Sequence, residues 1–270
     1  MIDSIKKNSL EFFNTNGLPS KKLENWKFTS SKNFKNFNKS LSSDEVKKIE
    51  SDELSIVFIN GVLDKDSLEN FKFADLIEVK NLNELTKKEL LYFSESFLNE
   101  SMFNLGVSEF ENGSYISFKE NSVIEEVINI KNYFFENGQN ERVSSFNIFH
   151  INERSEISII EEDIKENFSI FNLKLNKFIC ENSSIFKHGK SYNDDSQTHS
   201  LSYNYYQIEQ DVVLNVDSMV KSSFFNKEFI EVDLNKVGSD AKINILNLGK
   251  EEQHVDNNIL INHKSEHCTS

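Results

Sequence analysis

The sequence has few of the residues that cross-link or interrupt a fold. Its 270 residues include two cysteines, Cys180 and Cys268, one proline and eight glycines. Two cysteines are too few for a disulfide framework and are ordinary for a reducing compartment. No window approaches the roughly 18 apolar residues of a membrane-spanning helix, and the first residues, MIDSIKKNSLEFF, lack the apolar core of a signal peptide. We therefore expect a cytoplasmic protein that does not enter a membrane.

Positive charge is also scarce. The chain has 30 Lys and Arg against 44 Asp and Glu, a formal net charge of −14, and the basic residues are scattered among the acidic ones without a basic stripe. Such a chain repels a phosphate backbone, so we predict no nucleic-acid partner. Neither G-x-x-x-x-G-K-[ST] nor G-x-G-x-x-G is present. Any dependence on ATP has to come from a partner.

The first hundred residues carry mainly helical signals. Apolar residues recur at helical spacing over residues 2–13 and 82–103, and SSDEVKKIE (42–50) offers Ser43 or Asp44 as the N-cap of a further helix. Between them, LSIVFINGVLD (54–64) is apolar and β-branched and is interrupted by Asn60-Gly61, a strong hairpin signal. We predict a small, mainly helical N-terminal domain over residues 1–100 that contains a β-hairpin.

Short β-type runs follow one another from residue 101 to residue 270, with Asn, Asp and Ser at the turns. Such runs suggest a sandwich, a barrel or a solenoid. Self-similarity favours the solenoid, because Glu153, Ser155 and Ile157 recur 28 residues later as Glu181, Ser183 and Ile185, and Ser239 follows after a further 56. In a parallel β-helix each strand pairs with its equivalent one coil away. The predicted fold is therefore mainly β, with a parallel β-helix over residues 101–270.

The last residues, QHVDNNILINHKSEHCTS (253–270), concentrate metal-binding residue types. Zn²⁺ and Fe²⁺ accept imidazole, carboxylate and thiolate ligands. The candidate metal ligands are His254, Asp256, His263 and His267, with Cys268 beside them. A structural interpretation stays open, in which these side chains hydrogen-bond the backbone of neighbouring coils.

Other polar stretches are interpreted structurally. We expect residues 186–206, FKHGKSYNDDSQTHSLSYNYY, to form a loop between coils in which three tyrosines alternate between core and surface. The charge run EEDIKE (161–166) is predicted to be solvated, and Cys180 is predicted to be a buried small residue in a strand. We predict no catalytic residue and no cofactor-binding residue in this chain.

Four segments resemble the SufD component of the SUF iron–sulfur cluster assembly system, in the same order. The first is GLPSKKLENWKFTS (17–30), which is similar to the family pattern G-x-P-x-x-x-x-E-x-W-[KR]-[YF]-T. The others are IVFINGVLD (56–64), residues 101–130, in which a short helix enters the first coils, and the terminal run, similar to H-V-D-x-x-x-x-[IV]-x-H-x-x-x-x-[TC]-[TS]-S.

The resemblance implies a right-handed parallel β-helix and a non-enzymatic scaffold subunit. Its partners would be a SufB-like paralogue and a SufC-like ABC ATPase, and the full complex would hold a transient iron–sulfur cluster, whereas this chain alone would bind no cofactor. Members of the family continue beyond the terminal run to a K-C-S-H-G segment. We therefore expect a β-helix truncated at its C-terminal end, and we transfer no cluster ligand to this sequence.

The residues alone leave two other functions open. A carbohydrate-active β-helix enzyme usually displays a line of Asp, Arg or Lys along one sheet and is exported, whereas this chain has two arginines, Arg142 and Arg154. A stand-alone metal-binding protein would rely on the terminal histidines.

Overall fold

The computed structural model describes residues 2–40, 49, 51–86, 99–136, 138–165, 168–193, 198–221, 224–249 and 252–270. Its α-helices and 3-10 helices (η) are α1 (Ile2–Asn16), η1 (Glu24–Trp26), η2 (Ser31–Asn36), α2 (Asp66–Glu69), η3 (Ala74–Leu76), η4 (Leu82–Glu84) and α4 (Ser101–Glu109). Its strands are β1 (Asn38–Lys39), β2 (Ser55–Ile59), β3 (Val62–Leu63), β4 (Ile77–Asn81), β5 (Ser114–Phe118), β6 (Ile128–Phe134), β7 (Glu141–Ile151), β8 (Glu156–Lys165), β9 (Ile170–Cys180), β10 (Ile185–Asn193), β11 (Thr198–Ile208), β12 (Val213–Lys221), β13 (Phe225–Leu234), β14 (Asp240–Leu248) and β15 (His254–His263).

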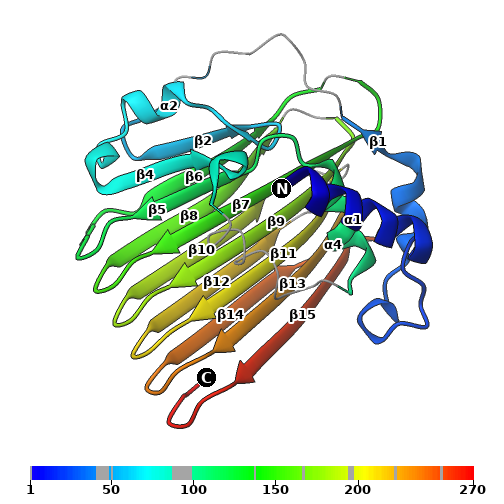
Figure 1. Ribbon diagram of the computed structural model, residues 1–270. Helices are drawn as coiled ribbons and strands as arrows, with labels where there is room; N and C mark the ends of the chain where they lie inside the picture. Colours follow the sequence, from blue (N-terminus) through cyan, green and yellow to red (C-terminus); the bar gives the residue numbers. More distant parts are fainter. Residues whose placement is uncertain are drawn as a thin grey trace.

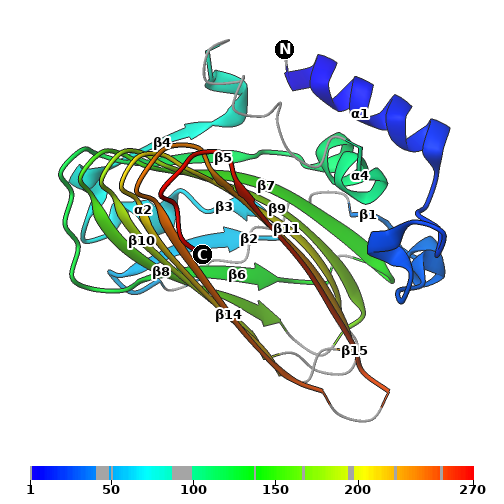
Figure 2. The same cartoon turned by 90° about the horizontal axis from the view of Figure 1, so that it is seen from below.

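Two mainly parallel β-sheets form a solenoid, and from β5 onward successive strands of the chain alternate between them. Sheet A has the order β15-β13-β11-β9-β7-β5-β4, with β1 beside β7, and sheet B has the order β14-β12-β10-β8-β6-β2-β3. From β5 onward each strand pairs in parallel with the strand one coil away (Figure 1). Seen from below, the two sheets enclose an interior, while α1 and α4 lie outside sheet A (Figure 2). This mainly β solenoid of about five turns confirms the predicted fold class.

One turn recurs in every coil and explains the sequence repeat. A residue with positive φ occupies it each time: Asn121, Arg154, Ser183, Asp211, Gly238 and His267. A small residue often follows, as in Ser122, Ser155, Ser184, Ser239 and Cys268. The 28-residue period predicted from the sequence makes Ser183 the equivalent of Ser155, which is wrong by one residue. This coil has 29 residues, since Ile185 pairs with Glu156, and the true equivalent of Ser155 is Ser184.

Sheet A is buried on both faces, whereas sheet B is buried mainly on its inner face. All eleven residues of β9 are buried, but burial alternates along β12. The outer face of sheet A is covered by α4 and by residues 17–40. Gly106 allows α4 to approach β9, because a Cβ there would lie 3.0 Å from Leu175 Cδ1.

This double burial corrects one expectation. Tyr203, Tyr205 and Tyr206 on β11 do not alternate between core and surface, since each is at most 2% exposed. Tyr206 faces the interior of the solenoid, and Tyr203 stacks outside it on Phe229 at a centroid distance of 4.7 Å. Cys180 is fully buried at the end of β9, as predicted.

The first hundred residues contribute to both sheets. The predicted hairpin is present as β2 and β3, with Asn60 and Gly61 both at positive φ, the geometry that an Asn-Gly hairpin turn requires. The predicted helix at residues 2–13 is α1. The helix predicted over 42–50 lies outside the described residues, except for residue 49. Of the helix predicted over 82–103, residues 87–98 also lie outside the described residues. None of the described helices is long and apolar enough to cross a membrane.

Candidate functional site

Two of the candidate metal ligands, His254 and Asp256, lie on the outer face of β15. His254 and Asp256 are two residues apart and so point to the same side of the strand. The Thr29 hydroxyl contacts both, at 2.9 Å from His254 Nε2 and with a hydrogen bond to Asp256 Oδ2. Because Thr29 donates its one proton to the carboxylate, it accepts from His254, which places the imidazole proton on Nε2. Lys227 Nζ also reaches Asp256, at 2.5 Å.

The segment that supplies Thr29 runs across sheet A, and we call residues 17–40 the arm. Its main anchor is Trp26, which is fully buried and meets Phe34 and Phe229 at centroid distances of 6.1 Å. The indole N–H donates to Glu100, the N-cap of α4. Burial raises the pKa of the Glu100 carboxyl, although hydrogen bonds from Trp26 and from the backbone oppose this effect. The arm thus connects α4 to the last strand of sheet A.

The remaining terminal candidates belong to the end of β15 and to the turn after it. His263 Nε2 lies 3.0 Å from Ser270 Oγ. His267 occupies the recurrent positive-φ position, and the Cys268 thiol donates to the Lys236 carbonyl of the preceding coil at 3.1 Å. Cys268 therefore takes the place that serine has in other coils. His254 and His263 hydrogen-bond to the side chains of Thr29 and Ser270, which corrects the expectation that these histidines bond the backbone of neighbouring coils.

The structure does not bring the four candidate ligands together. His254 and His263 stand at opposite ends of a strand of ten residues, a separation of about 30 Å. Among the described residues, no group of three or more His, Cys, Asp and Glu side chains is placed to hold a metal ion. His254 and Asp256 form a polar clamp with the arm instead.

A buried charge cluster occupies one half of the solenoid interior. Lys174 on β9 reaches Glu161 Oε1 at 2.8 Å and Asp163 Oδ1 at 2.9 Å across from β8. These three side chains are at most 7% exposed. Burial alone would lower the pKa of Lys174, but the facing carboxylates outweigh it and raise that pKa well above the ordinary value. The ammonium group is therefore charged inside the protein.

A second ion pair continues the cluster toward the next coils. Lys190 on β10 pairs with Glu228 on β13, and both side chains are at most 1% exposed. Asn204 donates to Glu228 at 2.9 Å and Ser218 donates to it at 3.0 Å. Each carboxylate thus has a cation and neutral donors, as buried charges require.

His188 lies between the two ion pairs. Its Nδ1 is 2.7 Å from the Tyr206 hydroxyl, and its Nε2 is 3.4 Å from Glu161 Oε2. Burial lowers the pKa of this imidazole, and the Glu161 carboxylate only partly offsets that effect. His188 is therefore neutral near pH 7. The other half of the interior is apolar and includes Phe178 and Leu214.

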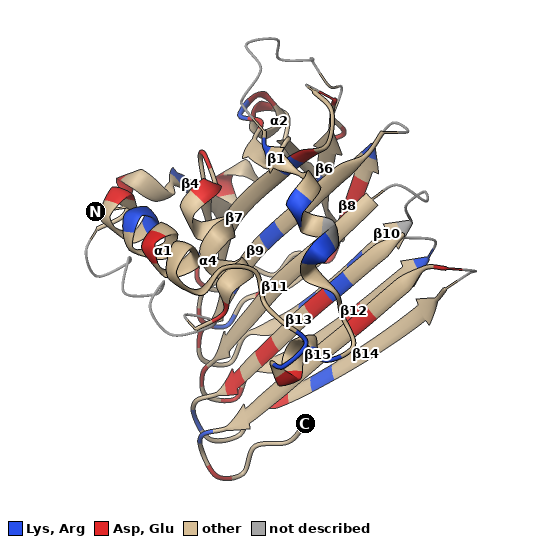
Figure 3. Ribbon diagram, turned by 90° about the vertical axis from the view of Figure 1, so that its right-hand side faces the viewer, with Lys and Arg blue, Asp and Glu red and all other residues tan. Residues whose placement is uncertain are grey.

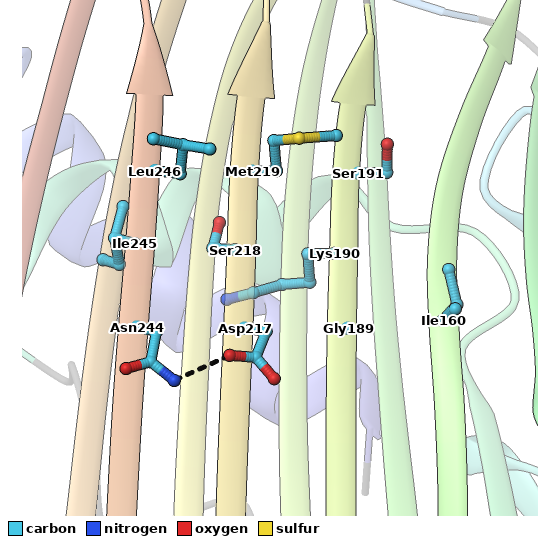
Figure 4. A pocket seen from close by; sticks show the side chains of 10 residues that line it. All are labelled: Ile160, Gly189, Lys190, Ser191, Asp217, Ser218, Met219, Asn244, Ile245 and Leu246. Carbon is cyan, nitrogen blue, oxygen red and sulfur yellow. Dashed lines mark hydrogen bonds between the residues drawn. The ribbon is translucent and has the colours of Figure 1, made fainter.

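The outer face of sheet B carries a shallow hollow of about 340 Å³ (Figure 4). Gly189 forms its floor, where a Cβ would come within 3.1 Å of Ile160 Cγ1. Met219 and Leu246 line it, and Asp217 accepts a hydrogen bond from Asn244 at 2.8 Å. The lining is mainly apolar and presents no His, Cys or Tyr side chain.

Comparison with protein families identifies the solenoid. The sequence model of the family described as "SUF system FeS cluster assembly, SufBD core domain" matches residues 134–270. The match covers 137 of the 270 residues, from the end of β6 through β15. The chain belongs to the SufBD core-domain family. This membership indicates involvement in iron–sulfur cluster assembly by the SUF system. No curated protein matches the chain.

Within this SufBD core, sequence reasoning missed the buried charges. Residues 161–166 were expected to be solvated, but Glu161 and Asp163 face the interior, because β8 alternates and its inward positions meet Lys174. Residues 186–206 were expected to form a loop, but most of them belong to β10 and β11; Asp194 and Asp195 lie outside the described residues. The inward positions of β10 include His188 and Lys190 beside Phe186, so apolar–polar alternation, the ordinary signal for a strand, is weak there.

We expect the SufBD core to lose stability in mild acid through His188. Its folded-state pKa is lowered, so its contribution is complete above the unfolded-state pKa of about 6.5 and is lost as the pH falls below that value. Urea unfolding at several values from about pH 7.5 to about pH 5.5 should show the free energy of unfolding decreasing. His188→Gln should flatten this dependence, whereas His267→Gln, at an exposed turn, should not. If the free energy of unfolding depends on pH equally in wild type and His188→Gln, His188 is not the source of the acid sensitivity.

The clamp at His254 is expected to stabilise the SufBD core without holding metal. His254→Ala removes the hydrogen bond to Thr29 and the stacking on Phe225, and should lower the free energy of unfolding by about 1–2 kcal/mol. Iron and zinc contents of the purified protein, measured by mass spectrometry, should stay unchanged. His263→Ala is the matched control and should change neither quantity much. Loss of stoichiometric metal in the His254 variant would contradict the structural role.

Proposed function

We propose that the chain is a SufD-like, non-enzymatic scaffold subunit of iron–sulfur cluster assembly, working beside a SufB-like solenoid and a SufC-like ABC ATPase in the cytoplasm. The iron–sulfur cluster would be the transient cargo of the full complex. This chain alone would hold no cofactor, and ATP hydrolysis would belong to the partner.

The observation that supports the SufD-like assignment is the contact between the arm and β15. The arm contains the GLPSKKLENWKFTS segment that resembles SufD, and it lies outside the matched residues 134–270. Thr29 of this segment bonds both His254 and Asp256 of the H-V-D run, and Asn258 donates to Asn25 at 3.0 Å. The two SufD-like segments therefore form one structural unit despite the 225 positions that separate Thr29 and His254.

The architecture also suits a scaffold. Lys174 and Lys190 are each bonded to carboxylates from a facing strand, which fixes the register between the sheets. A solenoid held in this way offers a long, rigid surface on which a second solenoid and an ATPase can be positioned. Nothing in this mechanism requires a catalytic residue on the chain.

Co-purification tests the proposal. The chain would be expressed together with a tagged SufB-like protein and an untagged SufC-like ATPase, and the tag would be captured. We expect this chain to be retained with both partners, and a tagged β-solenoid protein of an unrelated family, used as the bait in a parallel experiment, to retain none. A chain that folds and elutes without the SufB-like protein would contradict the proposal.

The two rival functions make different predictions. A carbohydrate-active enzyme would cleave an acidic polysaccharide without any partner, and a stand-alone metal-binding protein would lose bound iron or zinc when the terminal histidines are replaced. We expect neither result.

A further inference from the structure

The arm has a charge opposite to that of the rest of the molecule. Residues 17–40 contain one acidic residue, Glu24, and six lysines: Lys21, Lys22, Lys27, Lys32, Lys35 and Lys39. Their formal charge is +5, which leaves −19 on the remaining residues because the whole chain carries −14. The absence of a basic stripe inferred from the whole sequence is therefore wrong for this segment, which bears the blue bands along its short helices (Figure 3).

The arm is anchored rather than loose. Trp26, Thr29, Phe34 and Phe37 are at most 6% exposed and face sheet A. Phe34 stacks on Phe171 at 4.6 Å, so aromatic contacts hold the arm at several points along the sheet. The six lysines alternate with these anchors, and all of them are exposed. The positive charges are consequently presented on a fixed surface, which reduces the entropy lost when a partner binds.

Two apolar side chains lie exposed among these lysines. Phe28 is 77% exposed and Leu23 is 51% exposed, although each sits beside a basic residue. Lys27 Nζ is 5.3 Å from the centroid of the Phe28 ring. Exposed aromatic and aliphatic residues surrounded by charge are typical of protein interfaces, in which a buried apolar centre has a polar rim.

The negative charge on the rest of the chain indicates which kind of partner the arm can bind. A nucleic acid or an anionic membrane presents negative charge over a distance much longer than the screening length of about 8 Å at physiological salt. Either surface would also meet the −19 on the rest of the chain. An acidic patch on a protein is local, so it can face the arm and avoid the remaining acidic surface.

We propose that the outer face of the arm is a docking surface for a partner protein whose contacting surface is acidic and includes an apolar recess for Phe28. The lysines would accelerate association and orient the partner, while Phe28 and Leu23 would supply the apolar contact. This proposal does not depend on the assignment of the chain as SufD-like.

Binding of two labelled peptides to the full chain tests the proposal, with fluorescence anisotropy as the measurement. One peptide is polyglutamate, and the other is a glutamate-rich peptide with two central leucines. The arm variant is Lys22→Glu, Lys27→Glu, Lys32→Glu. The control variant, Lys65→Glu, Lys221→Glu, Lys242→Glu, changes the net charge equally at exposed positions outside the arm. Emission from Trp26, the only tryptophan, shows whether the arm stays docked in each variant.

We expect wild type to bind both peptides at low salt, and the arm variant to bind them about tenfold or more weakly, with the control variant close to wild type. The leucine-containing peptide should bind more tightly than polyglutamate, and Phe28→Ser should remove that difference. No binding at low salt, or equal losses in the arm and control variants, would overturn the proposal.

Three further outcomes would reassign the surface to another occupant and so overturn the proposal. Tighter binding of a labelled DNA duplex would indicate nucleic acid. Tighter binding of phosphatidylserine-containing vesicles would indicate a membrane surface. Concentration-dependent self-association that the arm variant abolishes would indicate a second copy of this chain.

Discussion

Lys174→Met is expected to lower the free energy of unfolding by about 3–5 kcal/mol, one of the largest effects of any single substitution in this protein. The variant keeps most of the side-chain volume but leaves Glu161 and Asp163 inside the solenoid without their cation. Burial raises the pKa of Asp163 already in the wild type, and the lysine is the principal group that opposes this. Without it, the carboxyls would take up protons on folding. The loss of stability should therefore be greater at pH 8 than at pH 5.

Chemical denaturation followed by far-ultraviolet circular dichroism measures this effect. Lys187→Met is the matched control on β10, because its ammonium pairs with Glu156 at 3.2 Å on the exposed face of sheet B. The control should lose at most about 1 kcal/mol. Glu161→Gln and Asp163→Asn, added to Lys174→Met, should restore part of the stability by removing the unpaired charges. Equal effects of Lys174→Met and Lys187→Met would show that the buried cluster is not an ion-pair network.

Trp26→Ala is expected to have a comparable effect, about 3–5 kcal/mol, by a different route. The substitution leaves a cavity between the arm and sheet A and removes the indole donor from the buried Glu100 carboxylate. Because Trp26 packs on Phe229 of β13, and Thr29 three residues later bonds His254 and Asp256 of β15, the loss should be concentrated in these two strands. Amide hydrogen exchange should accelerate in β15 much more than in β9, which α4 also covers.

Two controls separate packing from hydrogen bonding at Trp26. Phe28→Ala, two positions away and 77% exposed, should change the free energy of unfolding by less than about 0.5 kcal/mol. Trp26→Phe keeps much of the apolar contact but loses the N–H donor, and should cost about 1–2 kcal/mol. Unchanged exchange in β15 of the alanine variant would mean that the arm does not hold that strand.

The parts of the fold that local sequence determines were predictable. Asn60-Gly61 specifies its hairpin because both residues can adopt positive φ. The coil repeat was visible because one turn recurs with similar residues, yet its length changes: Val213 pairs with Asp240, 27 positions on, whereas Ile185 pairs with Glu156, 29 positions back. A fixed period could therefore find the solenoid but not the register.

The parts that depend on distant contacts were not predictable from one sequence. Lys174 can be buried only because Glu161 and Asp163 face it from the other sheet, and neither strand alone indicates that pairing. The outward side chains of β11 look like surface positions until the arm and α4 cover them. His254 suggested a metal ligand because histidine can either bind metal or hydrogen-bond a neighbouring side chain. The residue that decides between these two roles, Thr29, lies at the other end of the chain.

The mass of the assembly formed with a SufB-like protein tests the central claim most directly. The chain has a mass of 31.4 kDa. After co-expression, size-exclusion chromatography with light scattering should show this chain and the SufB-like protein in a single species with the summed mass of one copy of each, and a larger species when the SufC-like ATPase is added. A folded chain that remains at 31.4 kDa, or that pairs only with itself, in the presence of both proteins would contradict the assignment of this solenoid as a SufD-like scaffold.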